Sequence, residues 1–109
     1  MSVWVSLRAG PIAAASGDNT LLTVGEGHAV TVTKFHIVNT SASANIVVKF
    51  GIGASTDDSL ISPAITIPKK QMIDKYVNAN LGDSEILVLN ASATGITVTT
   101  NYDDLYPHL

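Results

Sequence analysis

The fold of this chain is decided by residues 28–53, whose sequence is HAVTVTKFHIVNTSASANIVVKFGIG. Apolar residues alternate with polar ones around Phe35 and Ile37, and the alternation returns between Ile46 and Phe50. This period of two is typical of β-strands that bury one face. The residues between the two runs are rich in Asn, Ser and Thr, which favour turns. The sequence therefore predicts a hairpin of two long strands.

The first of these two strands contains a change of phase. Val30 and Val32 are apolar, but they fall on the opposite side of a regular strand from Phe35. A single regular strand cannot bury all of these side chains on one face. We therefore expect a bulge or bend near Thr33 and Lys34.

Further segments with strand patterns give an all-β fold. Pro63 cannot donate a ladder hydrogen bond, so its strand is expected at a sheet edge. Residues 84–89 are apolar on both faces, as in a strand that is covered on both sides. With turns between them, about eight strands predict a single antiparallel β-sandwich of jelly-roll type. The further strands are expected at residues 3–7, 20–24, 60–67, 71–77, 84–89 and 94–102.

The 109 residues are enough for one domain with one core. We divide the chain into an N-terminal strand or arm (1–19), a sandwich (20–102) and a C-terminal tail (103–109). Within the arm, residues 12–19 are interpreted as a linker, and residues 78–83 are expected to form a turn. The predicted core consists of Phe35, Ile37, Ile46, Val48, Phe50, Ile86, Val88, Ile96 and Val98.

The composition indicates a surface that favours association. Charged residues make up 14% of the chain, against about 25% in an average soluble domain. The net charge of −3 and the single basic pair Lys69-Lys70 argue against nucleic acid as a partner. The N-terminus lacks the pattern of a signal peptide, and no apolar run is long enough to span a membrane. We therefore expect synthesis in the cytoplasm and no membrane partner.

No group of residues forms a recognisable catalytic, cofactor or metal site. The chain has no cysteine, which excludes disulfides and thiolate chemistry. His28 and His36 would lie about 26 Å apart on one extended strand, too far to share a metal. The acidic pairs at 57–58 and 103–104 lack the ligand spacing of a calcium loop. The sequence predicts no enzyme, no cofactor and no metal.

Four segments resemble small β-sandwich virion proteins of tailed bacteriophages. The resemblance covers residues 21–102, and members of that family carry Pro-Ala-Gly where this chain has Gly25-Glu26-Gly27. The family includes capsid decoration (cement) proteins and modules of tails and fibres. The resemblance is carried by residues 25–27 (GEG), 30–33 (VTVT), 35–43 (FHIVNTSAS) and 81–88 (LGDSEILV).

The resemblance implies a decoration protein on the head surface of a phage, a homotrimer that binds the major capsid protein and bridges capsomers. A tail, baseplate or fibre component is the alternative within the virion. A glycan-binding sandwich is an alternative of another class, and it would require solvent-facing aromatic residues grouped on one sheet.

The two ends of the chain are too apolar for free tails, so we expect them to contact neighbouring subunits. The alternative is that residues 3–7 form an edge strand of the chain's own sandwich. The residues expected at the interface are Trp4, Arg8, Tyr102, Tyr106 and Leu109.

Overall fold

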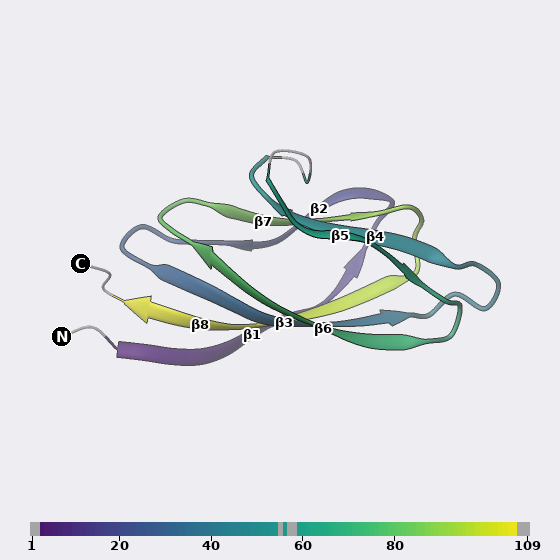
Figure 1. Cartoon of the computed structure of the whole chain (residues 1–109), viewed down its shortest axis with the longest axis horizontal. Helices are drawn as coiled ribbons and strands as arrows, with labels where there is room; N and C mark the ends of the chain where they lie inside the picture. Colours follow the sequence, from purple (N-terminus) through teal and green to yellow (C-terminus); the bar gives the residue numbers. More distant parts are fainter. Residues whose placement is uncertain (1–2, 55, 57–58, 107–109) are drawn as a thin grey trace.

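The chain is a two-layer antiparallel β-sandwich in a computed structural model that describes residues 3–54, 56 and 59–106 (Figure 1). Two four-stranded sheets have the strand orders β1-β8-β3-β6 and β2-β7-β4-β5. None of the described residues forms a helix that could span a membrane. The strands are β1 (Val3–Ala14), β2 (Gly17–Thr23), β3 (Ala29–Asn39), β4 (Ile46–Ile52), β5 (Leu60–Ile67), β6 (Met72–Leu81), β7 (Ile86–Ala91) and β8 (Ile96–Tyr106).

The strand order is that of a jelly roll, which confirms the predicted fold class. Among the described strands, only β4 and β5 follow each other in the chain and also pair. All other connections cross from one sheet to the other, as expected for a double-sheet jelly roll. The strand that contains Pro63, β5, lies at the end of its sheet as predicted.

The predicted hairpin between β3 and β4 is wrong, because these strands lie in different sheets. Phe35 on β3 and Phe50 on β4 stack across the core, with ring centroids 3.8 Å apart and an interplanar angle of 10°. Alternation showed that each strand buries one face. It does not show whether two such strands pair within one sheet or pack against each other from opposite sheets. The connection of residues 40–45 therefore bridges the two layers.

The predicted bulge in β3 is confirmed. The pairing of β3 with both β6 and β8 shifts between Val32 and Lys34. This shift returns Phe35 to the inner face, so that it is buried together with Val30 and Val32. One irregularity thus lets the whole length of β3 line the core.

The residues predicted to be buried are buried, except for Ile86 of β7. Ile86 is only half-buried, and Val88 is buried on the outer face of its sheet, whereas Leu87 and Leu89 point into the core. Val88 is covered because the backbone of Thr56 folds over the paired Gly51, where a Cβ atom would clash with it. Because both faces of β7 are covered, its sequence does not show which residues point into the core.

Two segments expected to lack strand structure form strands. Residues 12–19 were interpreted as a linker, but β1 continues through Ile12 to Ala14 after a bulge at the cis Gly10-Pro11 peptide, and β2 begins at Gly17. The turn expected over residues 78–83 starts later, because Ala79 and Leu81 of β6 are buried against β3. The strands of the sandwich therefore run from Val3 to Tyr106.

Candidate functional site

The two histidines lie at separate places, each paired with one carboxylate. His28 Nδ1 donates to the Asp104 carboxylate at 2.9 Å, and its ring stacks on Tyr106 with centroids 4.2 Å apart. His36 Nδ1 donates to Asp74 Oδ1 at 2.6 Å on the solvent side of β3 and β6. The described residues contain no group of three or more His, Asp and Glu side chains placed to hold a metal. The acidic pair at 57–58 lies outside the described residues.

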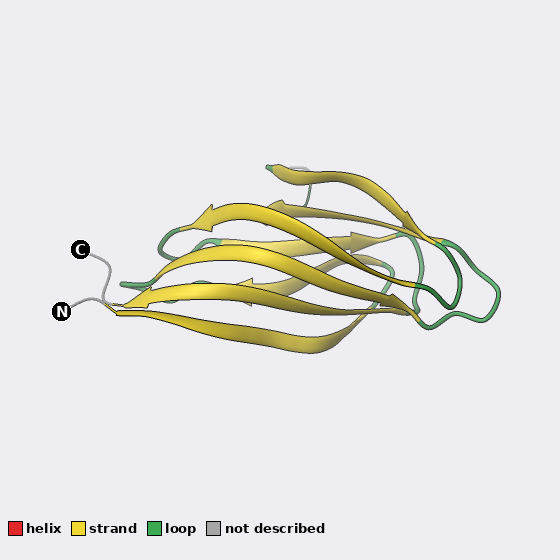
Figure 2. Ribbon diagram, turned by 60° about the horizontal axis from the view of Figure 1, so that its bottom comes forward, coloured by secondary structure: helices red, strands yellow, loops and turns green. Residues whose placement is uncertain are grey.

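The most distinctive surface is the free edge of β1, which we call the β1 edge and define as residues 3–9. Val3, Trp4, Val5 and Leu7 are exposed by 41–55% although all four are large and apolar. β1 is the outermost strand of its sheet, and Figure 2 shows it along the margin of the molecule. The edge therefore exposes apolar side chains next to backbone groups of an outermost strand.

Pairing with β8 determines which way these side chains point. Ser6 lies opposite Asp103 and donates to its Oδ1 at 2.7 Å on the solvent face, so Trp4 and Arg8 share that face. Leu7 lies opposite Tyr102, which packs against the core, so Val3 and Val5 point to the inner side. Their exposure on that side means that the second sheet does not cover this end of β1.

The β1 edge lacks the usual protection against pairing with another strand. Natural edge strands are protected by charges, prolines, bulges or shortness. Between Val3 and Ala9 the one charged residue is Arg8, and the bulge and Pro11 come only after this stretch. Such an edge is a site for strand addition or subunit contact.

The predicted interface residues fall on two adjacent strands but on both faces of the sheet. Trp4 and Arg8 of β1 face solvent, and Arg8 borders an open groove of about 550 Å³ with Asn101 and Asp103. Leu109 lies outside the described residues.

The two predicted tyrosines belong to β8 and face inward. Tyr106 is 54% exposed at the end of the molecule that carries both termini. Tyr102 is half-buried, and this burial, followed by the charge of Asp104, raises the pKa of its hydroxyl above the ordinary value. Trp4, Tyr102 and Tyr106 therefore do not form one aromatic platform.

A second exposed edge was missed in the sequence. Met72 and Tyr76 of β6 are exposed by 61% and 73%, and both lie on the solvent face with Asp74. Lys34 of β3 extends over the Tyr76 ring at 6.0 Å from its centroid. The alternation of Met72, Asp74 and Tyr76 was the available signal, but the mixed pattern of this segment hid which face was buried.

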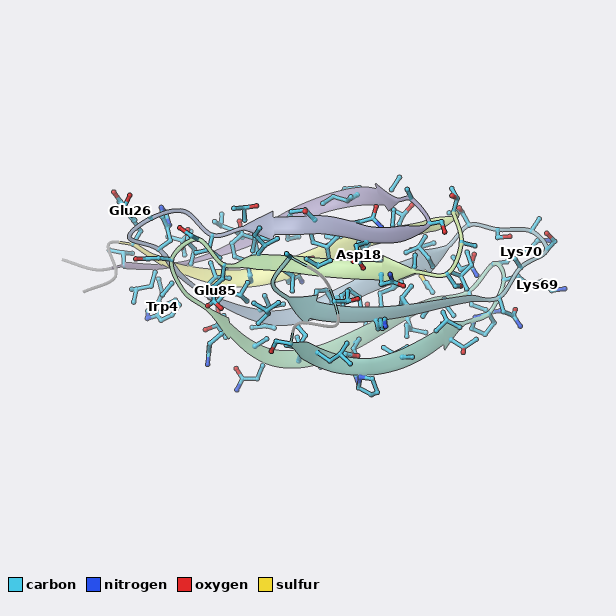
Figure 3. All side chains as sticks on the ribbon, turned by 90° about the horizontal axis from the view of Figure 1, so that it is seen from above. Trp4, Asp18, Glu26, Lys69, Lys70 and Glu85 are labelled. Carbon is cyan, nitrogen blue, oxygen red and sulfur yellow. The ribbon has the colours of Figure 1, made fainter. Side chains whose placement is uncertain are left out.

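The molecule is elongated and measures 50 × 24 × 19 Å. Figure 3 shows Glu26 and Glu85 toward the end with Trp4, and Lys69 and Lys70 at the opposite end. Other charged residues lie between these ends, including Asp18 in Figure 3, Lys34 on β3 and Asp74 on the β6 edge.

No protein-family model and no curated protein matches the sequence. Solved structures do match its fold. A chain of the infectious bursal disease virus particle aligns with a TM-score of 0.64 at 9% identity, over 97% of this chain and 31% of that chain. A chain from the Gx strain of that virus aligns with a TM-score of 0.57 at 11% identity, over 97% of this chain and 32% of that chain. This chain thus spans about a third of the length of those two.

A third match is of nearly equal length. A chain of the acid-stable capsid of Helicobacter pylori bacteriophage KHP30 aligns with a TM-score of 0.59 at 14% identity, over 98% of this chain and 94% of that chain. At these identities the matches establish the fold. The jelly roll described above is one that occurs in proteins of virus particles.

Proposed function

We propose that this chain is a structural protein of a bacteriophage virion, and specifically a decoration protein that bridges capsomers on the head surface. The observation that carries the proposal is the match of nearly the whole chain to a phage-capsid chain of about the same length. The exposed β1 edge adds to it, because a subunit that works by contact needs apolar surface that its own core does not cover.

The matched chains differ in length. The infectious bursal disease virus chains are about three times as long, whereas the KHP30 chain is similar in length to this one. A single small sandwich binds each neighbour modestly, so tight attachment requires several contacts at once. A homotrimer that holds the major capsid protein at several points meets this requirement.

The attachment surface is proposed to be the end of the molecule that carries both termini. Tyr106 is exposed there beside His28, and Trp4 lies on the neighbouring strand. Aromatic anchors of this kind contribute much of the binding energy of protein interfaces.

Two other functions receive less support. A tail, baseplate or fibre component would use the same exposed surfaces, but the phage match is to a capsid. Glycan binding requires aromatic rings on one face, whereas Trp4 faces solvent, Tyr106 faces the inner side and Tyr76 lies on the opposite edge of the sheet. A non-enzymatic role is proposed because the matched chains belong to a virus particle and to a phage capsid.

Co-sedimentation with phage heads that lack the protein tests this proposal. The purified protein is expected to pellet with such heads, and Tyr106→Ser is expected to weaken binding about tenfold or more, as for an aromatic anchor. The control is Leu60→Ser, since Leu60 on β5 is 53% exposed against 54% for Tyr106. An equal loss of binding to heads in both variants would contradict the proposed attachment surface. Failure of the unmodified protein to pellet with the heads would contradict the decoration role.

A further inference from the structure

We propose that the two free edges of sheet β1-β8-β3-β6 pair with each other between copies of this chain, so that β1 of one copy adds antiparallel to β6 of the next. Nine large apolar side chains are exposed among the described residues, and six of them lie on these two strands. The other two edge strands, β2 and β5, together contribute only Leu60. The six are Val3, Trp4, Val5, Leu7, Met72 and Tyr76.

Charge complementarity identifies a second copy as the partner. Arg8 is the one charged residue of the β1 edge, and it lies on the solvent face. On β6 that face carries Asp74 between Met72 and Tyr76. The Asp74 carboxylate already accepts a hydrogen bond from His36, but a carboxylate can accept several donors. An Arg8 side chain from a neighbouring copy therefore has an acidic partner on this edge.

The register that opposes Arg8 to Asp74 also matches Val3 and Val5 to inner-side residues of β6, whereas it places Leu7 opposite Lys75 and Trp4 opposite Asn78. In an antiparallel pair it places Val5 opposite Val77 and Val3 opposite Ala79. Val77 packs against the core and Ala79 is buried, so both belong to the inner side, as Val5 does. The contact would extend the apolar inner face of one copy into the next over about 23 Å of strand.

The strand directions permit this contact to close a ring. Three antiparallel pairings separate β1 from β6 within one copy, so the two strands run in opposite directions. Rotation about an axis along the strands therefore brings them together antiparallel. The contact is heterologous, because it joins two different edges of the chain. Three copies joined in this way would form a closed ring, which is the proposed trimer. The inference rests on the self-association in the proposed function and specifies its contact. It is tested with purified protein in solution, so its outcome does not depend on binding to a virion.

Cysteine cross-linking separates this contact from its main competitor, β1 paired with β1 of a second copy. The chain contains no cysteine, so each introduced thiol is unique. Directly opposed residues of an antiparallel pair lie within disulfide range. The double variant Val5→Cys/Val77→Cys is expected to form oxidised dimers and trimers on a non-reducing gel. Neither single variant is expected to cross-link, and a dimer of Val5→Cys alone would overturn the proposal.

Charge reversal gives a second readout that does not depend on thiol geometry. Sedimentation of Arg8→Glu and of Asp74→Arg is expected to show an association constant about tenfold weaker, because like charges would then oppose each other. The combination of both changes is expected to restore association, whereas the control Lys69→Glu at the far tip should leave it unchanged. A monomeric unmodified protein, or a double reversal that stays as weak as the singles, would overturn the proposal.

Discussion

At the scale of single residues, the stack of Phe35 on Phe50 joins the two sheets. Both rings are fully buried and lie 3.8 Å apart between centroids. Phe50→Ala is therefore expected to lower the free energy of unfolding by about 3–5 kcal/mol. Chemical denaturation measures this, with Val47→Ala on the exposed face of β4 as the control. If Phe50→Ala lowers the free energy of unfolding no more than the control does, this ring is not in the core.

Gly51 determines how closely the segment around Thr56 packs on its sheet. A Cβ atom at this position would collide with the Thr56 backbone, whereas one at Gly82 would lie 3.5 Å from a flexible Glu85 oxygen. Gly51→Ala is expected to destabilise the fold by roughly 1–3 kcal/mol through overpacking, and Gly82→Ala much less. Thermal unfolding of the pair checks this. Equal melting temperatures would mean that this segment does not cover Gly51.

The pair of His36 and Asp74 makes a prediction about pH. The hydrogen bond from His36 lowers the pKa of the Asp74 carboxyl below 3.8; burial opposes this shift, and the charges of Lys34 and then His36 add to it. A lowered folded-state pKa stabilises the fold above the unfolded value, and this contribution is lost as pH falls through the folded pKa. Carboxyl NMR titration should place the Asp74 midpoint below 3.8, and His36→Ala should raise it. A midpoint that does not respond to His36→Ala would contradict the pairing.

Residue patterns showed which side chains point into the core only in strands that expose their other face to solvent. Val30, Val32 and Phe35 revealed the β3 bulge, because their solvent-side neighbours are polar. Ile86 and Val88 were assigned to the core, whereas Leu87 and Leu89 occupy it, because apolar residues fill both faces of β7. The covering contact comes from Thr56, whose position no local pattern shows.

At the scale of strands, β1 is predicted to be the least protected part of its sheet. It pairs with β8 on one side, whereas β3 pairs on both sides. In a dilute sample, where copies are separate, amides of residues 3–9 are therefore expected to exchange hydrogen faster than those of β3. Mass spectrometry of exchanged peptides measures this. Concentrating the sample should slow exchange in residues 3–9, and fast exchange at every concentration would contradict pairing of this edge.

The strands could be predicted from the sequence better than their partners. Eight strand segments were predicted, most of them from period-two patterns, although β1, β2, β6 and β8 extend beyond the expected residues. The partner of β3 could not be found in the same way, because pairing in a jelly roll joins strands distant in sequence, such as β1 with β8. An edge strand over residues 3–7 was the alternative to an arm that contacts neighbouring subunits, whereas the β6 edge required knowledge of the sheet order.

At the scale of the whole molecule, the low charge of the chain matches a structure whose apolar side chains remain exposed along two edges. The fold could be predicted from alternation and composition, but the position of its contact surfaces follows from tertiary structure.

Direct imaging of intact phage particles purified from cells that produce this chain tests the proposed virion role most directly. The account predicts density for a jelly roll of this size on the outside of the head, in groups of three at the junctions of shell subunits, with the Tyr106 end against the shell. Particles that contain no such density, while the infected cell contains the protein, would contradict a structural role in the virion.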